Sequence, residues 1–139
     1  MTEALAALTA PMIQTFAALL LAHVLADFTF HTDWIVRHKR NPLVLLLHIV
    51  VVFGFTTAAL GGIWELALVI AAAHLVIDAV KLWALPRHIS SSFAGFAADQ
   101  TAHLATLCAA AIWFPGAVAA GTWADWLGLL TAPELLLSG

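Results

Sequence analysis

Long apolar stretches constrain the fold of this sequence more than any other feature. Four of them, residues 10–30, 43–60, 64–85 and 93–114, each contain 18 residues or more. A helix needs about 20 apolar residues to cross the hydrocarbon of a bilayer. Only 9% of the residues are charged and the mean hydropathy is +1.01, whereas about a quarter of a soluble domain is charged. The sequence therefore predicts an all-α, polytopic transmembrane helical bundle, with residues 1–139 forming a single domain.

Charged and turn-forming residues separate these four predicted spans. Residues 37–42 (Arg-His-Lys-Arg-Asn-Pro) follow the first span, Gly61-Gly62 follows the second, and residues 86–92 (Pro-Arg-His-Ile-Ser-Ser-Ser) follow the third. Proline suits the first turn of a new helix, and paired glycines favour a tight turn. Short connections of this kind predict that consecutive helices run antiparallel.

The positive charges predict the orientation in the membrane. All five Lys and Arg residues lie in or beside the first and third connections, at Arg37, Lys39, Arg40, Lys81 and Arg87. Because basic loops stay on the cytoplasmic side, the N-terminus is expected outside. Trp34 and Trp83 near the basic ends, and Trp64 and Trp113 near the opposite ends, fit the aromatic belts of the two interfaces. The predicted location is a bacterial inner membrane, crossed several times.

The C-terminal stretch, residues 117–137, is apolar but interrupted by Gly121, Asp125, Gly128 and Pro133. It is either a fifth span or an interfacial helix anchored by Trp123 and Trp126. The net charge of −3 argues against a nucleic-acid partner, and the single Cys108 excludes an intramolecular disulfide framework.

Histidine and aspartate recur four residues apart in the spans and, in one case, just past the end of the first span. The pairs are His23/Asp27, Asp27/His31, His74/Asp78 and Asp99/His103, whereas random placement of 7 His and 5 Asp predicts about half of one pair. Positions i and i+4 share a helix face, so both side chains of a pair can point at one site. With alternating helix directions, His48 and the three pairs that lie inside the spans fall at a similar depth, toward the basic end.

Three aspartates in hydrocarbon are costly and need compensation. Lys81 is the only basic residue inside a span, so one or two divalent ions (Zn, Mn or Fe) are the expected cofactor. The predicted metal ligands are His23, Asp27, His48, His74, Asp78, Asp99 and His103, with His31 and Asp33 as further candidates. They suit a mononuclear site or a two-metal site with a bridging carboxylate. Helix-to-helix hydrogen bonding and a proton pathway are the alternative interpretations.

A combination of motifs runs through the chain: His23-Val-Leu-Ala-Asp27-Phe, then Thr32-Asp33-Trp34 and Lys39, then His74-x-x-x-Asp78-x-x-Lys81, then Asp99-Gln100-x-x-His103. In this combination the chain resembles a family of small bacterial integral membrane proteins known only as a domain of unknown function. That family commonly has Gln before the Thr-Asp-Trp element, where this chain has His31. More distantly, the pattern is similar to membrane-bound metal-dependent hydrolases, which implies hydrolysis as the activity.

The leading functional hypothesis is a metal-dependent hydrolase of a lipid or lipid-linked substrate at the cytoplasmic leaflet. Asp99 is the expected general base, and Lys81 is expected to hold an anionic group of the substrate. The alternatives are a non-haem di-iron oxidase or hydroxylase, a metal-ion or proton translocator, and a non-catalytic subunit of a larger membrane complex. The expected partners are membrane lipid and the lipid-like substrate, with an oligomer or membrane complex left open.

Overall fold

The described chain is almost entirely helical. Its long helices begin and end close to the predicted boundaries, except that the first begins at Thr2, before the predicted span 10–30. The computed structural model describes residues 2–29 and 32–123, with side chains from residue 10 onward. The long helices are α1 (Thr2–Val24), α3 (Pro42–Ala59), α4 (Trp64–Ala79) and α6 (Phe93–Trp113). Two of them continue as π-helical segments, α1 into η1 (Leu25–Thr29) and α4 into η2 (Val80–Ala84). The two described ranges contain no strand, so the all-α expectation is confirmed.

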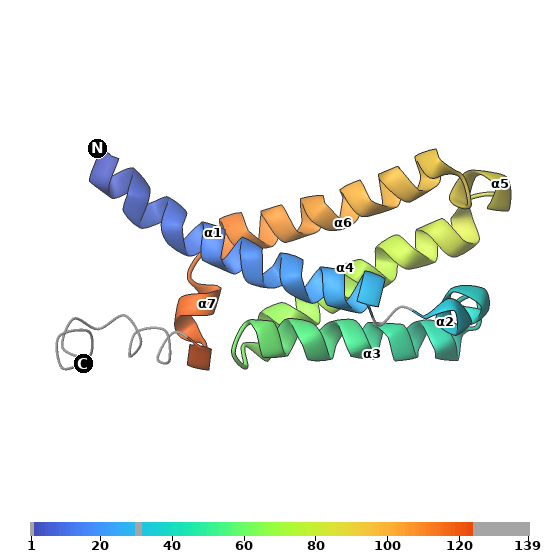
Figure 1. Cartoon of the computed structure of the whole chain (residues 1–139), viewed down its shortest axis with the longest axis horizontal. Helices are drawn as coiled ribbons and strands as arrows, with labels where there is room; N and C mark the ends of the chain where they lie inside the picture. The colour runs from blue at the N-terminus through green and yellow to red at the C-terminus, as the bar shows by residue number, and fades with distance from the viewer. Residues whose placement is uncertain (1, 30–31, 124–139) are drawn as a thin grey trace.

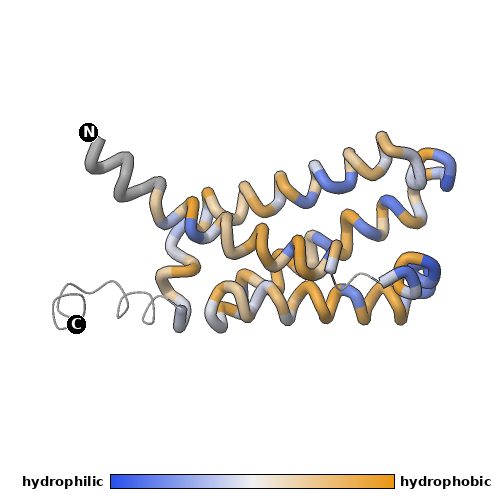
Figure 2. Tube along the Cα trace, in the orientation of Figure 1, coloured by the Kyte–Doolittle hydropathy of each residue, from blue (hydrophilic) through white to orange (hydrophobic). Residues whose placement is uncertain are grey.

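Within residues 2–29 and 32–123, three helical segments are long and apolar enough to cross a membrane: Ala10–Thr29, Pro42–Ala59 and Trp64–Ala84. They match the first three predicted spans. Helix α6 matches the fourth in its bounds but is not among the three. Its sequence includes Asp99, Gln100 and His103, which make it less apolar than the others (Figure 2). Of the predicted segment 117–137, only the part up to residue 123 is described, and it contains the short helix α7 (Ala117–Ala120).

The four long helices lie side by side (Figure 1). Helices α1 and α4 each contact both α3 and α6, which gives the cyclic order α1, α3, α4, α6. Large apolar side chains cover the outside: Leu43, Phe93 and Trp113 are 75%, 84% and 78% exposed. A soluble protein rarely exposes so many large apolar side chains, so this surface is suited to lipid.

Short helices mark the two ends of the bundle. Figure 1 shows α2 (Asp33–His38) and α5 (Arg87–Ser90) at one end and α7 at the other. The first and third connections, which contain most of the basic residues, therefore lie together, as the antiparallel arrangement predicts. We call this end the basic end.

An apolar core fills the half of the bundle nearer α7, with the buried residues Leu19, Leu60, Leu66, Ile70, Leu107, Ala110, Ala117 and Val118. The adjacent turn between α3 and α4 depends on Gly61 and Gly62, whose φ angles are +71° and +98°. A Cβ atom on Gly61 would lie 2.7 Å from the backbone nitrogen of Thr122. That nitrogen donates a hydrogen bond to the Gly61 carbonyl at 2.9 Å, which fastens the residues after α7 to the turn.

Candidate metal centre

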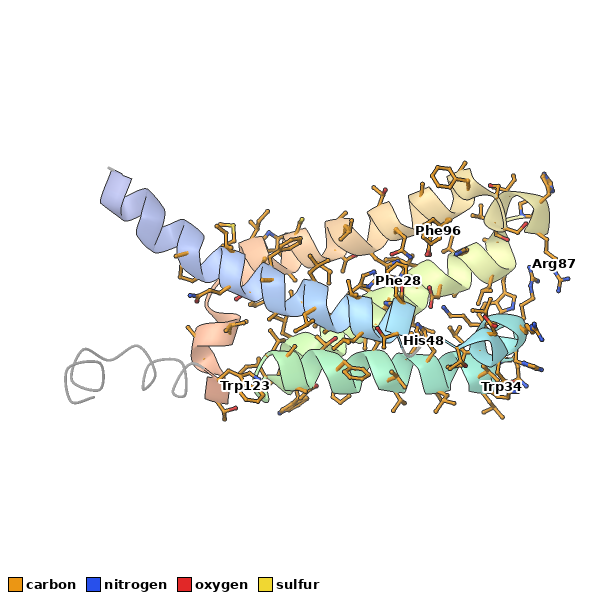
Figure 3. All side chains as sticks on the ribbon, in the orientation of Figure 1. Phe28, Trp34, His48, Arg87, Phe96 and Trp123 are labelled. Carbon is orange, nitrogen blue, oxygen red and sulfur yellow. The ribbon has the colours of Figure 1, made fainter. Side chains whose placement is uncertain are left out.

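The half of the bundle nearer the basic end has a polar interior to which all four long helices contribute. The seven predicted ligands are His23 on α1, Asp27 on η1, His48 on α3, His74 and Asp78 on α4, and Asp99 and His103 on α6. None of their side chains is more than 7% exposed. Figure 3 labels His48, which lies in the half of α3 nearer the basic end. The structure thus brings all seven residues into one buried cluster.

Four ligand-type atoms from three segments form the centre of this cluster. The Nε2 atoms of His48 and His74 are 3.1 Å apart. Asp27 Oδ1 lies 3.1 Å from His48 Nε2 and 3.3 Å from His74 Nε2. Asp78 Oδ2 lies 3.3 Å from His74 Nε2 and 3.8 Å from His48 Nε2. We call these four residues the tetrad.

The spacing within the tetrad fits a divalent metal ion. In a tetrahedral site with metal–ligand distances of about 2.0–2.2 Å, the ligand atoms are separated by about 3.3–3.6 Å. Five of the six separations among the four atoms run from 3.1 to 3.8 Å. Two imidazole nitrogens and two carboxylate oxygens are also a common donor set for zinc, manganese and iron. The residues therefore fit the predicted cofactor.

A lysine from outside the predicted spans also reaches the tetrad. Lys39, the residue after α2, is only 9% exposed, and its Nζ lies 2.7 Å from Asp78 Oδ2. The second lysine, Lys81 on η2, lies 3.4 Å from Asp99 Oδ2. The sequence-based count of one lysine against three aspartates was therefore wrong, because two ammonium groups lie in the cluster. Three carboxylates and two ammonium groups leave an excess of one negative charge.

His103 and Asp99 form a second group of ligand-type residues next to the tetrad. His103 Nδ1 donates to the Asp99 backbone carbonyl at 2.8 Å, which leaves Nε2 as the ring nitrogen with a free lone pair. That Nε2 is buried, makes no hydrogen bond and lies 3.7 Å from Asp78 Oδ1. Suitable ligand atoms of Asp78, Asp99 and His103 lie within 4.8 Å of one another. Asp78 thus belongs to both groups, the position that a bridging carboxylate would take.

His23 lies beside the tetrad and has a polar neighbour that the sequence analysis did not assign to the site. Its Nε2 donates to Gln100 Oε1 at 3.0 Å, and Gln100 Nε2 donates to Asp99 Oδ2 at 3.1 Å. His23 Nε2 is also 3.8 Å from Asp27 Oδ2. Gln100 therefore links two predicted ligands, His23 and Asp99, and holds their orientation. Its place directly after Asp99 in the sequence was the available signal.

Of the two additional candidates, only Asp33 is described, and it lies outside the cluster. Asp33 is exposed in the first turn of α2, where the side chain of Thr32 accepts a hydrogen bond from the Ile35 nitrogen as the N-cap. His31 lies outside the described residues. Trp34 is 54% exposed and stacks on His38 with ring centroids 4.7 Å apart, at the basic end (Figure 3).

The local backbone explains how two of the charged groups reach the cluster. Asp27 and Lys81 both lie in π-helical segments, η1 and η2, that end long helices. In η2 the Leu85 nitrogen donates to the Val80 carbonyl at 3.2 Å, an i→i+5 bond. A π turn shifts the angular position of the residues that follow it, and such turns are frequent at functional sites.

Two cavities border the cluster on different sides. The smaller, about 10 Å³, is large enough for about one water molecule, and His23, His74 and His103 contribute to its lining. The larger, about 420 Å³, lies toward the basic end and reaches Asp78. We call it the basic pocket; its lining residues are Val36, Lys39, Asp78, Lys81, Leu82, Ser90, Ser91, Ser92 and Phe96. A ligand in this pocket would contact a tetrad carboxylate directly.

Comparison with known proteins gives one match. A family model described as "Protein of unknown function (DUF3307)" matches residues 15–126, which is well over half of the chain and includes the whole cluster. No curated protein and no solved structure matches the chain.

Proposed function

This chain belongs to the DUF3307 family of proteins of unknown function, and we propose that it is a membrane-embedded, metal-dependent hydrolase. The proposed substrate is a lipid or a lipid-linked molecule that enters from the cytoplasmic leaflet. One observation carries the proposal: the metal-like spacing of His48, His74, Asp27 and Asp78 next to a pocket that reaches Asp78.

The proposal includes a fourth membrane span, α6. This helix has 21 residues, or about 31 Å at 1.5 Å per residue, which matches the hydrocarbon thickness. It packs along α1 and α4, and its acidic and imidazole groups, Asp99 and His103, are buried against them. The basic end then faces the cytoplasm and the N-terminus faces outward, with the last residues of the chain forming a fifth span or an interfacial helix.

The proposed ligands are the tetrad, with His103 and Asp99 available for a second ion that would share Asp78. A bound divalent ion supplies Lewis acidity toward a phosphoryl or acyl oxygen and allows water to act as a nucleophile near neutral pH. Of the tetrad, Asp78 lines the basic pocket, so a substrate in the pocket would lie beside the residues that would hold the ion. The neighbouring apolar helices restrict access of bulk water.

The chain's own residues have separate roles in this proposal. Asp99 Oδ1 is buried and makes no hydrogen bond, so it is available to accept a proton from water as general base. Lys81 is the more accessible of the two lysines, with a side chain 28% exposed, and is suited to hold an anionic group of the substrate. Gln100 positions Asp99 and His23 through its two hydrogen bonds.

Metal analysis of the purified protein tests the proposal. Wild type should retain about one or two equivalents of zinc, manganese or iron after gel filtration, and His74→Ala and Asp78→Asn should each lose it. His88→Ala and Asp33→Asn are the matched controls, because both residues are exposed outside the cluster. Well-folded wild type that stays metal-free after incubation with each of the three ions would refute the metal centre.

A transport assay then separates hydrolysis from the translocation hypothesis. Protein in sealed proteoliposomes should release a water-soluble product from a lipid substrate in a metal-dependent way, without moving protons or metal across the membrane. A metal- or proton-dependent flux without turnover would favour the translocator. Bound iron with a charge-transfer absorption would favour the oxidase.

A further inference from the structure

We propose that the basic pocket binds a phosphate group of an amphiphilic ligand, with the phosphate held by Lys39 and Lys81. The proposal rests on the proposed function in one respect, since it names the substrate class of that site. It is argued from the lining of the pocket, and the affinity for phosphate can be measured without turnover.

The charge of the lining favours an anion. Two ammonium groups and one carboxylate, that of Asp78, border the pocket, and the two lysines come from different segments of the chain. Each ammonium has three donors and makes one ion pair, at 2.7 Å for Lys39 and 3.4 Å for Lys81. Donors therefore remain on both lysines for oxygens of a ligand. A phosphate monoester carries about −1.5 to −2 charges at pH 7. Two cations therefore match a phosphate better than they match a carboxylate, which carries a single charge.

The rim of the pocket is polar for a structural reason. Ser90 ends α5, and Ser91 and Ser92 form the turn between α5 and α6. Ser92 accepts a hydrogen bond from the Gly95 nitrogen at 3.0 Å as the N-cap of α6. A side chain at Gly95 would collide with the Ile89 carbonyl, so glycine allows this turn to lie against the helix. The Ser90 and Ser91 hydroxyls donate to the Arg87 carbonyl, and the Ser92 hydroxyl donates to the Ile89 carbonyl. The part of this rim that suits an anion is therefore the amino-terminal end of the 21-residue helix α6.

The apolar part of the lining favours an amphiphilic ligand over a wholly polar phosphate compound. Val36, Leu82 and Phe96 border the same pocket as the lysines. Val36 is 58% exposed and Phe96 44% exposed, so the apolar wall continues onto the outer surface of the bundle. Figure 3 shows Phe96 on α6. A volume of about 420 Å³ holds a phosphorylated headgroup with the beginning of an acyl chain.

Calorimetric titration of the full chain in dodecyl maltoside tests this proposal. The probes are dihexanoyl phosphatidic acid, inorganic phosphate and dihexanoylglycerol, which lacks the phosphate. We expect wild type to bind the phosphatidic acid and not to bind dihexanoylglycerol. Lys81→Gln should lower the affinity for phosphatidic acid at least about tenfold. Arg87→Gln is the matched control, because Arg87 lies at the same end but does not line the pocket.

The remaining measurements distinguish a lipid phosphate from free phosphate. They also show whether a variant with weaker lipid binding is still folded. If the natural ligand is a lipid, Phe96→Ala should lower the affinity for phosphatidic acid and leave the affinity for inorganic phosphate unchanged. Equal affinity for both probes in wild type and in Phe96→Ala would identify free phosphate as the ligand.

Metal content measured on the same samples separates this proposal from the proposed function. If a metal-free protein binds phosphatidic acid in a way that depends on Lys81, the phosphate site in the basic pocket is supported and the proposed hydrolase function is contradicted. Failure of both phosphate probes to bind wild type, or equal binding to Lys81→Gln, would overturn the pocket whatever the metal content.

Discussion

The ion pair between Lys39 and Asp78 gives the sharpest quantitative prediction. Its Nζ–Oδ2 distance is 2.7 Å, and the two side chains are 11% and 3% exposed. At an effective dielectric constant of about 20, two unit charges at this distance attract by about 6 kcal/mol. Desolvation opposes part of this attraction, and removal of one partner of a buried pair costs about 3–5 kcal/mol. Lys39→Met should therefore lower the free energy of unfolding by about 3–5 kcal/mol in chelated protein.

A double-mutant cycle with Asp78→Asn isolates the interaction between the two residues. Unfolding by sodium dodecyl sulfate in mixed micelles, followed by circular dichroism, gives the free energies of wild type, both single variants and the double variant. We expect a coupling energy of at least about 2 kcal/mol, because the double variant buries no unpaired charge. Lys81→Met is the matched variant and should cost less, about 1 kcal/mol, because its side chain is 28% exposed and its pair is 3.4 Å apart. A coupling energy below about 0.5 kcal/mol would refute the reasoning.

Three further predictions concern other parts of the structure. Gln100→Leu should weaken metal retention about tenfold in equilibrium dialysis, since it removes the hydrogen bonds to two candidate ligands; unchanged retention would contradict that positioning role. Gly61→Ala should cost about 1–2 kcal/mol in the same unfolding assay because φ is +71°, whereas Gly54→Ala, with open space around its Cβ, should be neutral or stabilising. Ser91→Cys in a Cys108→Ser background should react with an impermeant maleimide only after the cells are permeabilised, and labelling of intact cells would reverse the proposed orientation.

The helices could be predicted from the sequence because their signals are local. Apolar length predicts the segments, and the Asn41-Pro42 and Gly61-Gly62 pairs mark where a helix begins or the chain turns. In the structure the Asn41 side chain accepts a hydrogen bond from the Leu43 nitrogen as the N-cap, and both glycines have positive φ. Helix boundaries depend on such neighbouring residues, so no tertiary information was needed.

The clustering of histidines and aspartates could also be predicted, because it follows from helix geometry. A spacing of four residues places His74 and Asp78 on one face, and antiparallel helices bring equivalent depths together. The structure has His74 Nε2 and Asp78 Oδ2 at 3.3 Å. The presence of a metal, the number of bound ions and the catalytic roles of the residues stay predictions.

The contributions of Lys39 and Gln100 could not be derived from periodicity. Lys39 follows α2, outside every predicted span, and its side chain reaches Asp78 only because α2 packs against α3 at the basic end. Gln100, like Lys39, belongs to the family motifs, but its role depends on α1 and α6 lying side by side. The π-helical segments η1 and η2 have no reliable signature in a single sequence. In each case tertiary packing, not local sequence, determines the contact.

The internal lysines also predict how the fold responds to removal of metal. Lys39 and Lys81 pair with two of the three aspartates, so the cluster without metal has an excess of only one negative charge, which one protonated histidine balances. A classical zinc finger, in contrast, depends on its metal for folding and unfolds when the metal is removed. Dialysis against EDTA should therefore leave the helical circular dichroism signal unchanged and lower the stability only by the binding free energy, about 2.7 kcal/mol at a metal concentration of 100 Kd. Loss of the helical signal on chelation would show that the metal is a structural element, and it would remove the main reason for regarding the centre as a reversible, reactive site.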